Sequence, residues 1–343
     1  MIKVGFSHHG ELTIMEDCRI EDGFPTLITV NKNLNSHDWK QRLAIYKAQF
    51  KQQLLKRGAL VFRDFSIDST ENFSDFIKTM DLGSFVNYIG GDSPRDKVTN
   101  EIYTSTEAPP SIYIPPHQEL SYLKTYPKYI SFYCEIEPQI QGETVIADAR
   151  KVYQRLDSNV IKHFQEKGLT YISHYYQQSK FMDVINYFAN SHKSWVDVFE
   201  TDKKEEVEAF CQSNEIRWKW LRSNWIEIRH TRPATLEHPI TKETVWFNQA
   251  HLYDFNPRLL GLVNFLAMKF IYFRRLTRLH EVTFADGSII PREDLYHILD
   301  VLRKNTVSLP WKKGDVMILD NILTMHGRAT FKGKRRILTA LIS

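Results

Sequence analysis

The chain of 343 residues is long enough for one large domain or two smaller ones. Hydrophobic residues make up 42% and charged residues 25%, a composition typical of folded globular proteins that excludes collagen-like, mucin-like and disordered chains. The formal net charge of +4 is too small for a dedicated nucleic-acid-binding protein, whose basic residues must displace counterions at many phosphates. Aromatic residues reach 13%, which favours packed sheets and an aromatic-walled pocket.

The cysteines and apolar stretches indicate the compartment. Cys18, Cys134 and Cys211 are far apart and odd in number, so they predict neither a disulfide framework nor a CxxC zinc site. The first residues contain no apolar signal segment. The longest apolar stretch, 259–273, is too short to cross a bilayer and predicts a core or amphipathic helix. We therefore expect a cytoplasmic protein without a membrane span.

The N-terminal part is predicted to alternate helix and strand. Residues 38–56 carry apolar side chains at helical spacing, and Gly58 ends this helix before an apolar strand at 59–62. A second helix is expected at 69–80, with Ser69 or Thr70 as its N-cap.

The rest of the chain is predicted to be mainly β. Residues 151–208 form the main exception, because their pattern predicts a largely helical insertion, and a further amphipathic helix is expected at 293–303. Short apolar runs bounded by turn residues predict strands at 111–114, 129–134, 144–147, 225–228, 244–247, 316–319 and 337–342. No repeat or linker interrupts the sequence, so we expect residues 1–343 to form a single domain, a curved β-sandwich or barrel with helices outside.

The first candidate metal ligands lie in the sequence Pro-Pro-His-Gln-Glu at 115–119. In an extended segment residues i and i+2 project to the same face, so His117 and Glu119 can present an imidazole nitrogen and a carboxylate oxygen to one point. The His-x-Glu pattern alone is weak, because it occurs by chance in many proteins.

A second candidate, His326, follows the apolar strand at 316–319 and a short polar run. Two histidines and one carboxylate form a facial triad that suits Fe(II) and leaves three positions for a bidentate oxoacid and dioxygen. A basic run at 334–336 follows, and an arginine there can bind a distal carboxylate bidentately. We choose Arg336 for this role; the alternative for Arg335 and the lysines is a solvated basic turn.

These residues resemble the Fe(II)/2-oxoglutarate-dependent taurine dioxygenase (TauD/TfdA) superfamily, and within it the SyrP-like branch linked to amino-acid hydroxylation in peptide-antibiotic pathways. The resemblance implies a cupin-like double-stranded β-helix, or jelly roll, with His117, Glu119 and His326 as iron ligands. Similar blocks lie at 58–65, 105–107, 117–122, 142–144, 238–241, 246–249, 326–328 and 335–336.

The resemblance also implies how the cosubstrate is bound. Thr144 falls 25 residues after Glu119 and would donate its hydroxyl to the distal carboxylate of 2-oxoglutarate, with Arg336 as the ionic partner. The spacing from His326 to Arg336 is one residue shorter than in taurine dioxygenase, so Arg335 remains an alternative anchor.

Two departures from the family pattern narrow the reaction. A glutamate, Glu119, stands where aspartate is commoner, and a carboxylate at this position argues against halogenation, which needs that coordination site for halide. Ala340 aligns near the sulfonate-binding arginine of the taurine enzyme, which argues against taurine as the substrate.

Four further residues are candidates for substrate binding or for support of the ligands. Asn248 and Gln249 end a predicted strand with amide groups, although turn chemistry explains them nearly as well. Arg328 can orient a substrate carboxylate or pair with Asp320, and Tyr122 can form part of the pocket wall.

The function expected from the resemblance is hydroxylation of an unactivated C–H bond of an amino acid, free or tethered to a carrier protein, in secondary metabolism. The cofactor would be Fe(II), with 2-oxoglutarate and O2 as cosubstrates, and no nucleic acid would take part. Two alternatives use the same residues: a zinc-dependent hydrolase, disfavoured because no HExxH helix is present, and a non-catalytic barrel that binds a ligand. The oligomeric state stays open.

Overall fold

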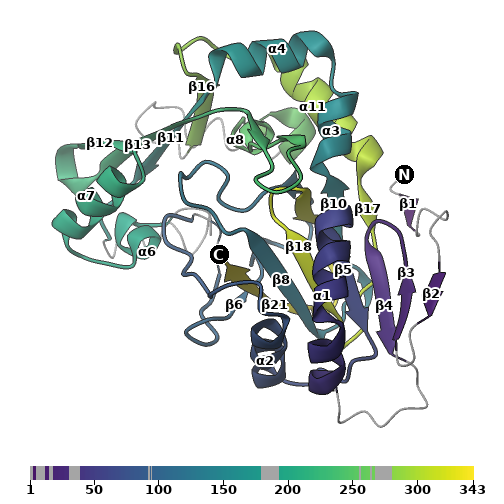
Figure 1. The fold of residues 1–343 in the computed structure, drawn as a ribbon. Helices are drawn as coiled ribbons and strands as arrows, with labels where there is room; N and C mark the ends of the chain where they lie inside the picture. The colour runs from purple at the N-terminus through teal and green to yellow at the C-terminus, as the bar shows by residue number, and fades with distance from the viewer. Residues whose placement is uncertain are drawn as a thin grey trace.

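The computed structural model describes residues 3–4, 12–14, 18–30, 39–91, 93, 95–178, 193–254, 256–262, 265–266 and 280–343. Its body consists of two β-sheets with helices on their outer faces (Figure 1). This arrangement is the jelly roll, so the predicted fold class, mainly β with flanking helices, is confirmed.

The larger sheet has eight strands. It pairs the apolar segments 59–63 and 316–320, which are far apart in the sequence. In spatial order its strands are β2 (Leu12–Ile14), β3 (Cys18–Glu21), β4 (Thr26–Val30), β5 (Ala59–Arg63), β18 (Val316–Asp320), β8 (Tyr129–Ile136), β21 (Arg336–Ile342) and β6 (Tyr103–Thr104).

Two helices, α1 (Trp39–Arg57) and α2 (Thr70–Met80), cover the outer face of this sheet. The side-chain alternation of β18 explains how the sheet is buried on both faces. Ile318 packs toward the helices, whereas Met317 and Leu319 pack into the main core. Ser69 caps α2 as predicted, because its hydroxyl accepts a hydrogen bond from the Asn72 backbone N–H at 3.1 Å.

The smaller sheet has five strands and carries the two histidines of the predicted triad. Its strands in spatial order are β1 (Lys3–Val4), β17 (Val307–Ser308), β10 (Thr144–Asp148), β19 (Thr324–Arg328) and β7 (Ile114–His117). Helices α3 (Ala149–Arg155) and α11 (Arg292–Asn305) pack against this sheet. The strand predicted at 111–114 is wrong in position: β7 begins at Ile114 and continues through both prolines to His117.

A separate four-stranded sheet lies beside the two main sheets (Figure 1). It consists of β12 (Arg217–Trp220), β13 (Ile226–Arg232), β11 (Leu169–Tyr175) and β16 (His280–Phe284). Strand β11 falls inside the segment 151–208, where a largely helical insertion was predicted. The helices of that region and its C-terminal flank are α4 (Ser158–Lys167), α6 (Trp195–Phe199) and α7 (Lys204–Ser213), and residues 179–192 lie outside the described part.

Short elements complete the described chain. They are the hairpin β14 (Thr235–Glu237) and β15 (Thr244–Trp246), the pair β9 (Ile140–Gln141) and β20 (Phe331–Lys332), and the helices α8 (Ala250–Tyr253) and α9 (Pro257–Leu260). Most of the predicted helix at 259–273 lies outside the described residues.

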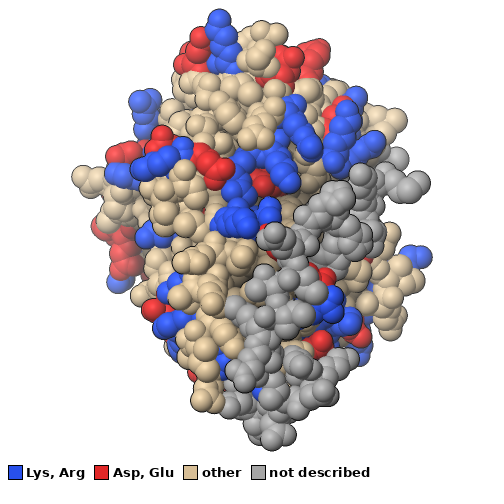
Figure 2. All heavy atoms as spheres, turned by 45° about the vertical axis from the view of Figure 1, so that its right-hand side comes forward, with Lys and Arg blue, Asp and Glu red and all other residues tan. Residues whose placement is uncertain are grey.

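Three further observations concern the cysteines, the helices and the surface. Cys18, Cys134 and Cys211 are buried and free. Among the described helices, none is both long and apolar enough to cross a membrane. Basic and acidic side chains are mixed on the face shown in Figure 2.

Candidate metal centre

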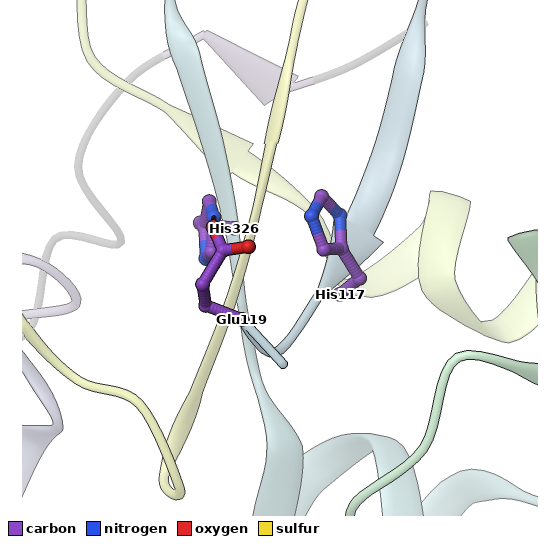
Figure 3. Close-up of side chains that lie close together, drawn as sticks. All are labelled: His117, Glu119 and His326. Atoms are coloured by element: carbon purple, nitrogen blue, oxygen red, sulfur yellow. Dashed lines mark ion pairs between the residues drawn. The ribbon is translucent and has the colours of Figure 1, made fainter. Parts of the chain in front are cut away.

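Three side chains from two neighbouring strands and the turn after one of them converge at the inner face of the smaller sheet. His117 ends β7, Glu119 follows two residues later, and His326 lies in the middle of β19. Strands β7 and β19 are antiparallel, and His117 stands opposite His326 in their register. Figure 3 shows both imidazoles and the Glu119 carboxylate close together.

The distances between these groups suit a single metal ion. The imidazole centroids of His117 and His326 lie 4.7 Å apart, and His326 Nε2 is 3.5 Å from Glu119 Oε2. Each residue offers one ligand atom within 4.8 Å of the other two, and in the described part of the chain no second His, Cys, Asp or Glu group of this kind occurs. All three residues are buried. The structure thus brings together the three ligands that the resemblance implied.

The protonation states also suit a metal. His117 Nδ1 lies 2.9 Å from the Pro115 carbonyl oxygen, which can only accept, so Nδ1 carries the proton and Nε2 keeps its lone pair. Burial, and then the nearby His326, lower the pKa of His117 to about 3, so its imidazole is neutral. Burial alone would raise the pKa of Glu119, but Arg95 and His326 outweigh it and the pKa is lowered. A neutral imidazole and an ionised carboxylate are ligand forms, and the two-histidine, one-carboxylate set fits Fe(II).

The backbone of Glu119 is fixed by Asn321, a residue that the sequence reading missed. The Glu119 N–H donates to Asn321 Oδ1 at 2.8 Å, and Asn321 Nδ2 donates to the Glu119 carbonyl at 3.0 Å and to the Pro127 carbonyl at 2.8 Å. Asn321 is fully buried. Its position in the polar run between β18 and His326 was the signal that could have identified it.

Arg95 is a second missed residue. Its guanidinium Nη2 donates to Glu119 Oε2, and both side chains are almost fully buried. No motif surrounds Arg95 in the sequence, so only the folded chain reveals the contact.

A cavity of about 190 Å³ opens beside the candidate ligands. Tyr122 and Gln249 line this cavity, as predicted for substrate-binding candidates, whereas Asn248 does not. The Asn248 amide instead donates to the Ala234 carbonyl at 2.8 Å and accepts from the Ala250 N–H at 3.1 Å, which is a turn role. Further lining residues that were not predicted are Tyr88, Ser93, Thr106, Leu252, Tyr253 and His280.

The structure places the two adjacent arginines on opposite sides of β21. The Arg336 side chain is 47% exposed and its Nε donates to Glu135 at 2.8 Å. Arg335 is turned inward, where its Nε donates to the Gly142 carbonyl at 2.8 Å and Nη1 to Ser105 Oγ at 3.2 Å. This geometry does not support the choice of Arg336 as the cosubstrate anchor, because its side chain points to solvent. Arg335, the stated alternative, is half-buried and faces inward.

Arg335 borders a second cavity of about 180 Å³, shared with Arg328 and Phe331. Arg328 does not pair with Asp320: its two terminal nitrogens donate to four backbone carbonyls of the 106–112 segment, at 2.6 to 3.1 Å. Asp320 binds His238 instead, at 3.1 Å.

Thr144, the other predicted cosubstrate residue, begins β10 and is buried. It stands opposite Arg328 in the β10–β19 register and follows Gly142, the residue whose carbonyl binds Arg335, by two positions. Thr144 therefore follows the residue that binds Arg335 by two positions, but it does not line the cavity beside Arg335.

Comparison with known proteins gives both a family and relatives. Residues 21–341 match the family model of the taurine catabolism dioxygenase TauD, TfdA family. The dapdiamide synthesis protein DdaC of Enterobacter agglomerans is 34% identical over 289 residues, which cover 84% of this chain and 83% of DdaC. A clavaminate synthase-like protein of Arabidopsis thaliana is 27% identical over 305 residues, covering 88% of this chain and 86% of the relative.

Solved structures share the fold. PvcB from Pseudomonas aeruginosa matches with a TM-score of 0.56 at 14% identity, covering 98% of this chain and 94% of PvcB. A second structure of PvcB, an Fe, alpha-ketoglutarate dependent oxygenase from an isonitrile synthetic pathway, matches with a TM-score of 0.51 and the same coverage. The family match spans nearly the whole chain, and the His-Glu-His set lies within it. The chain therefore belongs to the TauD, TfdA family and is a non-haem oxygenase that depends on Fe(II), 2-oxoglutarate and O2.

Proposed function

We propose that this oxygenase hydroxylates an unactivated C–H bond of an amino acid, free or tethered to a carrier protein, in secondary metabolism. The convergence of His117, Glu119 and His326 beside a small cavity carries the proposal. DdaC is a dapdiamide synthesis protein and PvcB belongs to an isonitrile synthetic pathway, and both support a biosynthetic role. A cavity of about 190 Å³ suits a small substrate group rather than a polymer.

In this proposal each part of the site has a defined task. His117, Glu119 and His326 hold Fe(II), and Thr144 with Arg335 binds the distal carboxylate of 2-oxoglutarate. When bound, the iron with its cosubstrates supplies the oxidising chemistry. The chain's own side chains orient the substrate: Tyr122 and Gln249 line the wall beside the ligands.

Family membership removes the reason for the two alternatives, a zinc hydrolase and a non-catalytic barrel. The geometry adds a second argument, because a hydrolase has no use for the buried arginine cavity beside Arg335. His117 ends a strand and Glu119 follows in the next turn, so the ligands do not form the helical HExxH arrangement.

The test is anaerobic addition of Fe(II) and 2-oxoglutarate to the purified protein. We expect a weak visible charge-transfer band, together with slow succinate formation once air is admitted. His326→Ala should remove both signals, because the variant lacks one of the three ligands. The absence of a band in folded wild-type protein, or a band that the His326→Ala variant retains, contradicts the assignment. Amino acids and their carrier-bound thioesters that accelerate succinate formation then identify the substrate.

A further inference from the structure

Arg95 is a buried cation that the proposed function leaves without a role. Arg95 lies in the loop after α2. Its Nη2 donates to Glu119 Oε2, and its guanidinium carbon lies 4.4 Å from the ring centroid of Tyr88. The Arg95 side chain is 3% exposed and that of Glu119 is 4% exposed. The contact therefore joins a candidate metal ligand to a cation that solvent barely reaches.

The other donors of Arg95 show which contact determines its position. Nε and Nη1 are buried and have no hydrogen-bond acceptor among the residues that the structure describes. Each unpaired buried N–H group destabilises the fold, so these two nitrogens do not explain why an arginine lies at this position. Within the described part of the chain, the polar contact of Arg95 is the one to Glu119, and Tyr88 fixes the plane of the guanidinium beside it by a cation–π contact.

A glutamate ligand needs such a restraint more than an aspartate does. Its side chain has one more rotatable bond, so the carboxylate can turn until both oxygens face the metal. Two imidazoles, one carboxylate oxygen, a chelating 2-oxoacid and dioxygen together fill six positions. A second oxygen from Glu119 would take a position that the cosubstrates require.

We propose that Arg95 is a positioning residue that fixes the rotation of the Glu119 carboxylate, so that Glu119 offers the metal a single oxygen. The inference rests on the proposed function, because it requires that His117, Glu119 and His326 hold the metal. Groups that orient metal ligands commonly alter metal affinity or activity by about 10- to 100-fold when they are removed.

The test compares Arg95→Gln and Arg95→Lys with wild-type protein in two measurements. The first is the visible spectrum of the Co(II)-loaded protein, whose intensity reports the coordination number. The second is the affinity of the anaerobic Fe(II)-loaded protein for 2-oxoglutarate, measured from the charge-transfer band. Arg150→Gln is the matched control, because Arg150 also binds a carboxylate, Asp148 at 2.9 Å, and contacts none of the three ligands.

We expect Arg95→Gln to change the Co(II) spectrum and to weaken 2-oxoglutarate binding by about 10-fold or more. Arg95→Lys should recover part of the affinity, because an ammonium can still donate to the carboxylate but does not fix its plane. The control should resemble wild type in both measurements. If Arg95→Gln does not fold by circular dichroism, Arg95→Met, which keeps the apolar stem against Tyr88, takes its place.

An Arg95→Gln (or Met) variant with the wild-type Co(II) spectrum and wild-type 2-oxoglutarate affinity overturns the inference. So does an Arg150→Gln control that shows the same losses, since the effect would then not be specific to Glu119. Wild-type protein that gives no band with Fe(II) and 2-oxoglutarate is a different outcome, because it rejects the proposed metal site itself.

Discussion

Arg335 and Arg336 are chemically identical neighbours in opposite environments. Burial, and then the nearby Arg328, lower the pKa of Arg335 to about 10, and its hydrogen bonds go to a carbonyl and a hydroxyl. Among the described residues the half-buried Arg335 makes no ion pair, so a carboxylate ligand would offset the cost of withdrawing this cation from water. Arg336 is half-exposed and already paired with Glu135. This contrast is the reason for assigning the cosubstrate carboxylate to Arg335.

The assignment predicts unequal effects of two matched variants. Arg335→Gln should raise the Kd for 2-oxoglutarate by about 10- to 100-fold, because a hydrogen bond to a charged group contributes roughly 1.5–3 kcal/mol. Arg336→Gln should change it by less than about 2-fold, since an exposed ion pair contributes little. Titration of the anaerobic Fe(II) protein, followed by the visible band, measures both. The reverse ranking would return the role to Arg336.

At the scale of elements, Arg328 ties the 106–112 segment to β19. Its four hydrogen bonds reach the carbonyls of Thr106, Ala108, Pro109 and Ile112, so one side chain binds most of the carbonyl groups in that segment. The same segment lines the cavity beside Arg335, and Thr106 also borders the cavity at the metal ligands. Arg328 thus supports two walls at once, a role that differs from direct substrate contact.

Arg328→Lys should loosen this segment, because an ammonium cannot reach four carbonyls in the plane of a guanidinium. We expect amide hydrogen exchange in peptides covering 105–113 to accelerate by about 10-fold or more, which corresponds to the loss of at least 1.4 kcal/mol of local stability. Exchange in α2 should stay unchanged and serves as the internal control. Unaltered exchange at 105–113 would show that the segment is held by other contacts.

The close pairing of strands β7 and β19 depends on Gly327, the residue between His326 and Arg328. A Cβ at Gly327 would lie 2.2 Å from the Ile114 carbonyl oxygen and 2.9 Å from backbone atoms of Pro115. These are backbone atoms of the paired strand, so the two strands must separate to admit a methyl group. This separation would also move His117 and His326 apart, because they lie opposite each other in the same strand pair.

Gly327→Ala should therefore lower both the thermal midpoint and the affinity for Co(II), with overpacking alone costing roughly 1–3 kcal/mol. Gly23→Ala is the control, because its Cβ would meet only the Pro25 carbonyl oxygen at 3.5 Å, an ordinary contact. Differential scanning calorimetry and metal titration measure the two effects. If Gly327→Ala matches Gly23→Ala in thermal midpoint and in Co(II) affinity, the space between β7 and β19 is larger than the structure indicates.

The elements that could be predicted from the sequence are those whose pattern is local. Strands β5, β18 and β21 were found because apolar runs end at turn residues, and α1 and α2 because of their helical spacing. Strand β11 was missed, since it is buried on both faces and shows no alternation.

The site shows the same division between local and long-range information. The three ligands followed from spacing and family resemblance, and the structure brings them together. Arg336 was preferred over Arg335, although the alternation of β21 favours Arg335: Ile337 and Leu341 pack into the main core, and Arg335 lines a cavity together with Ile337. The contacts of Arg95 and Asn321 with Glu119 arise only from tertiary structure.

At the scale of the whole molecule, several histidine side chains are buried in the interior around the polar site. Burial, and then Arg232, lower the pKa of His230 to about 3, and burial lowers that of His251 to about 4. With His117, three buried histidines are thus neutral in the folded chain at pH values where the unfolded chain binds protons, because the ordinary histidine pKa is about 6.5. The contribution of these three histidines to the free energy of unfolding is therefore greatest above pH 6.5, and it falls as the pH drops toward 4.

Each of these imidazoles should contribute about 1.4 kcal/mol per pH unit to that slope between roughly pH 6 and 4. His230→Phe removes one of them while keeping a ring against Tyr122, which His230 contacts edge-on at 5.3 Å. In metal-free protein with a chelator present, urea unfolding at pH 7, 6, 5 and 4.5 should give a shallower pH dependence for His230→Phe by that amount. The wild-type and variant curves should run parallel above about pH 7.5, where His230 is neutral in both the folded and the unfolded state. An equal slope below pH 6 would show that His230 takes up its proton in the folded chain, and that the interior around the site is more hydrated than its packing indicates.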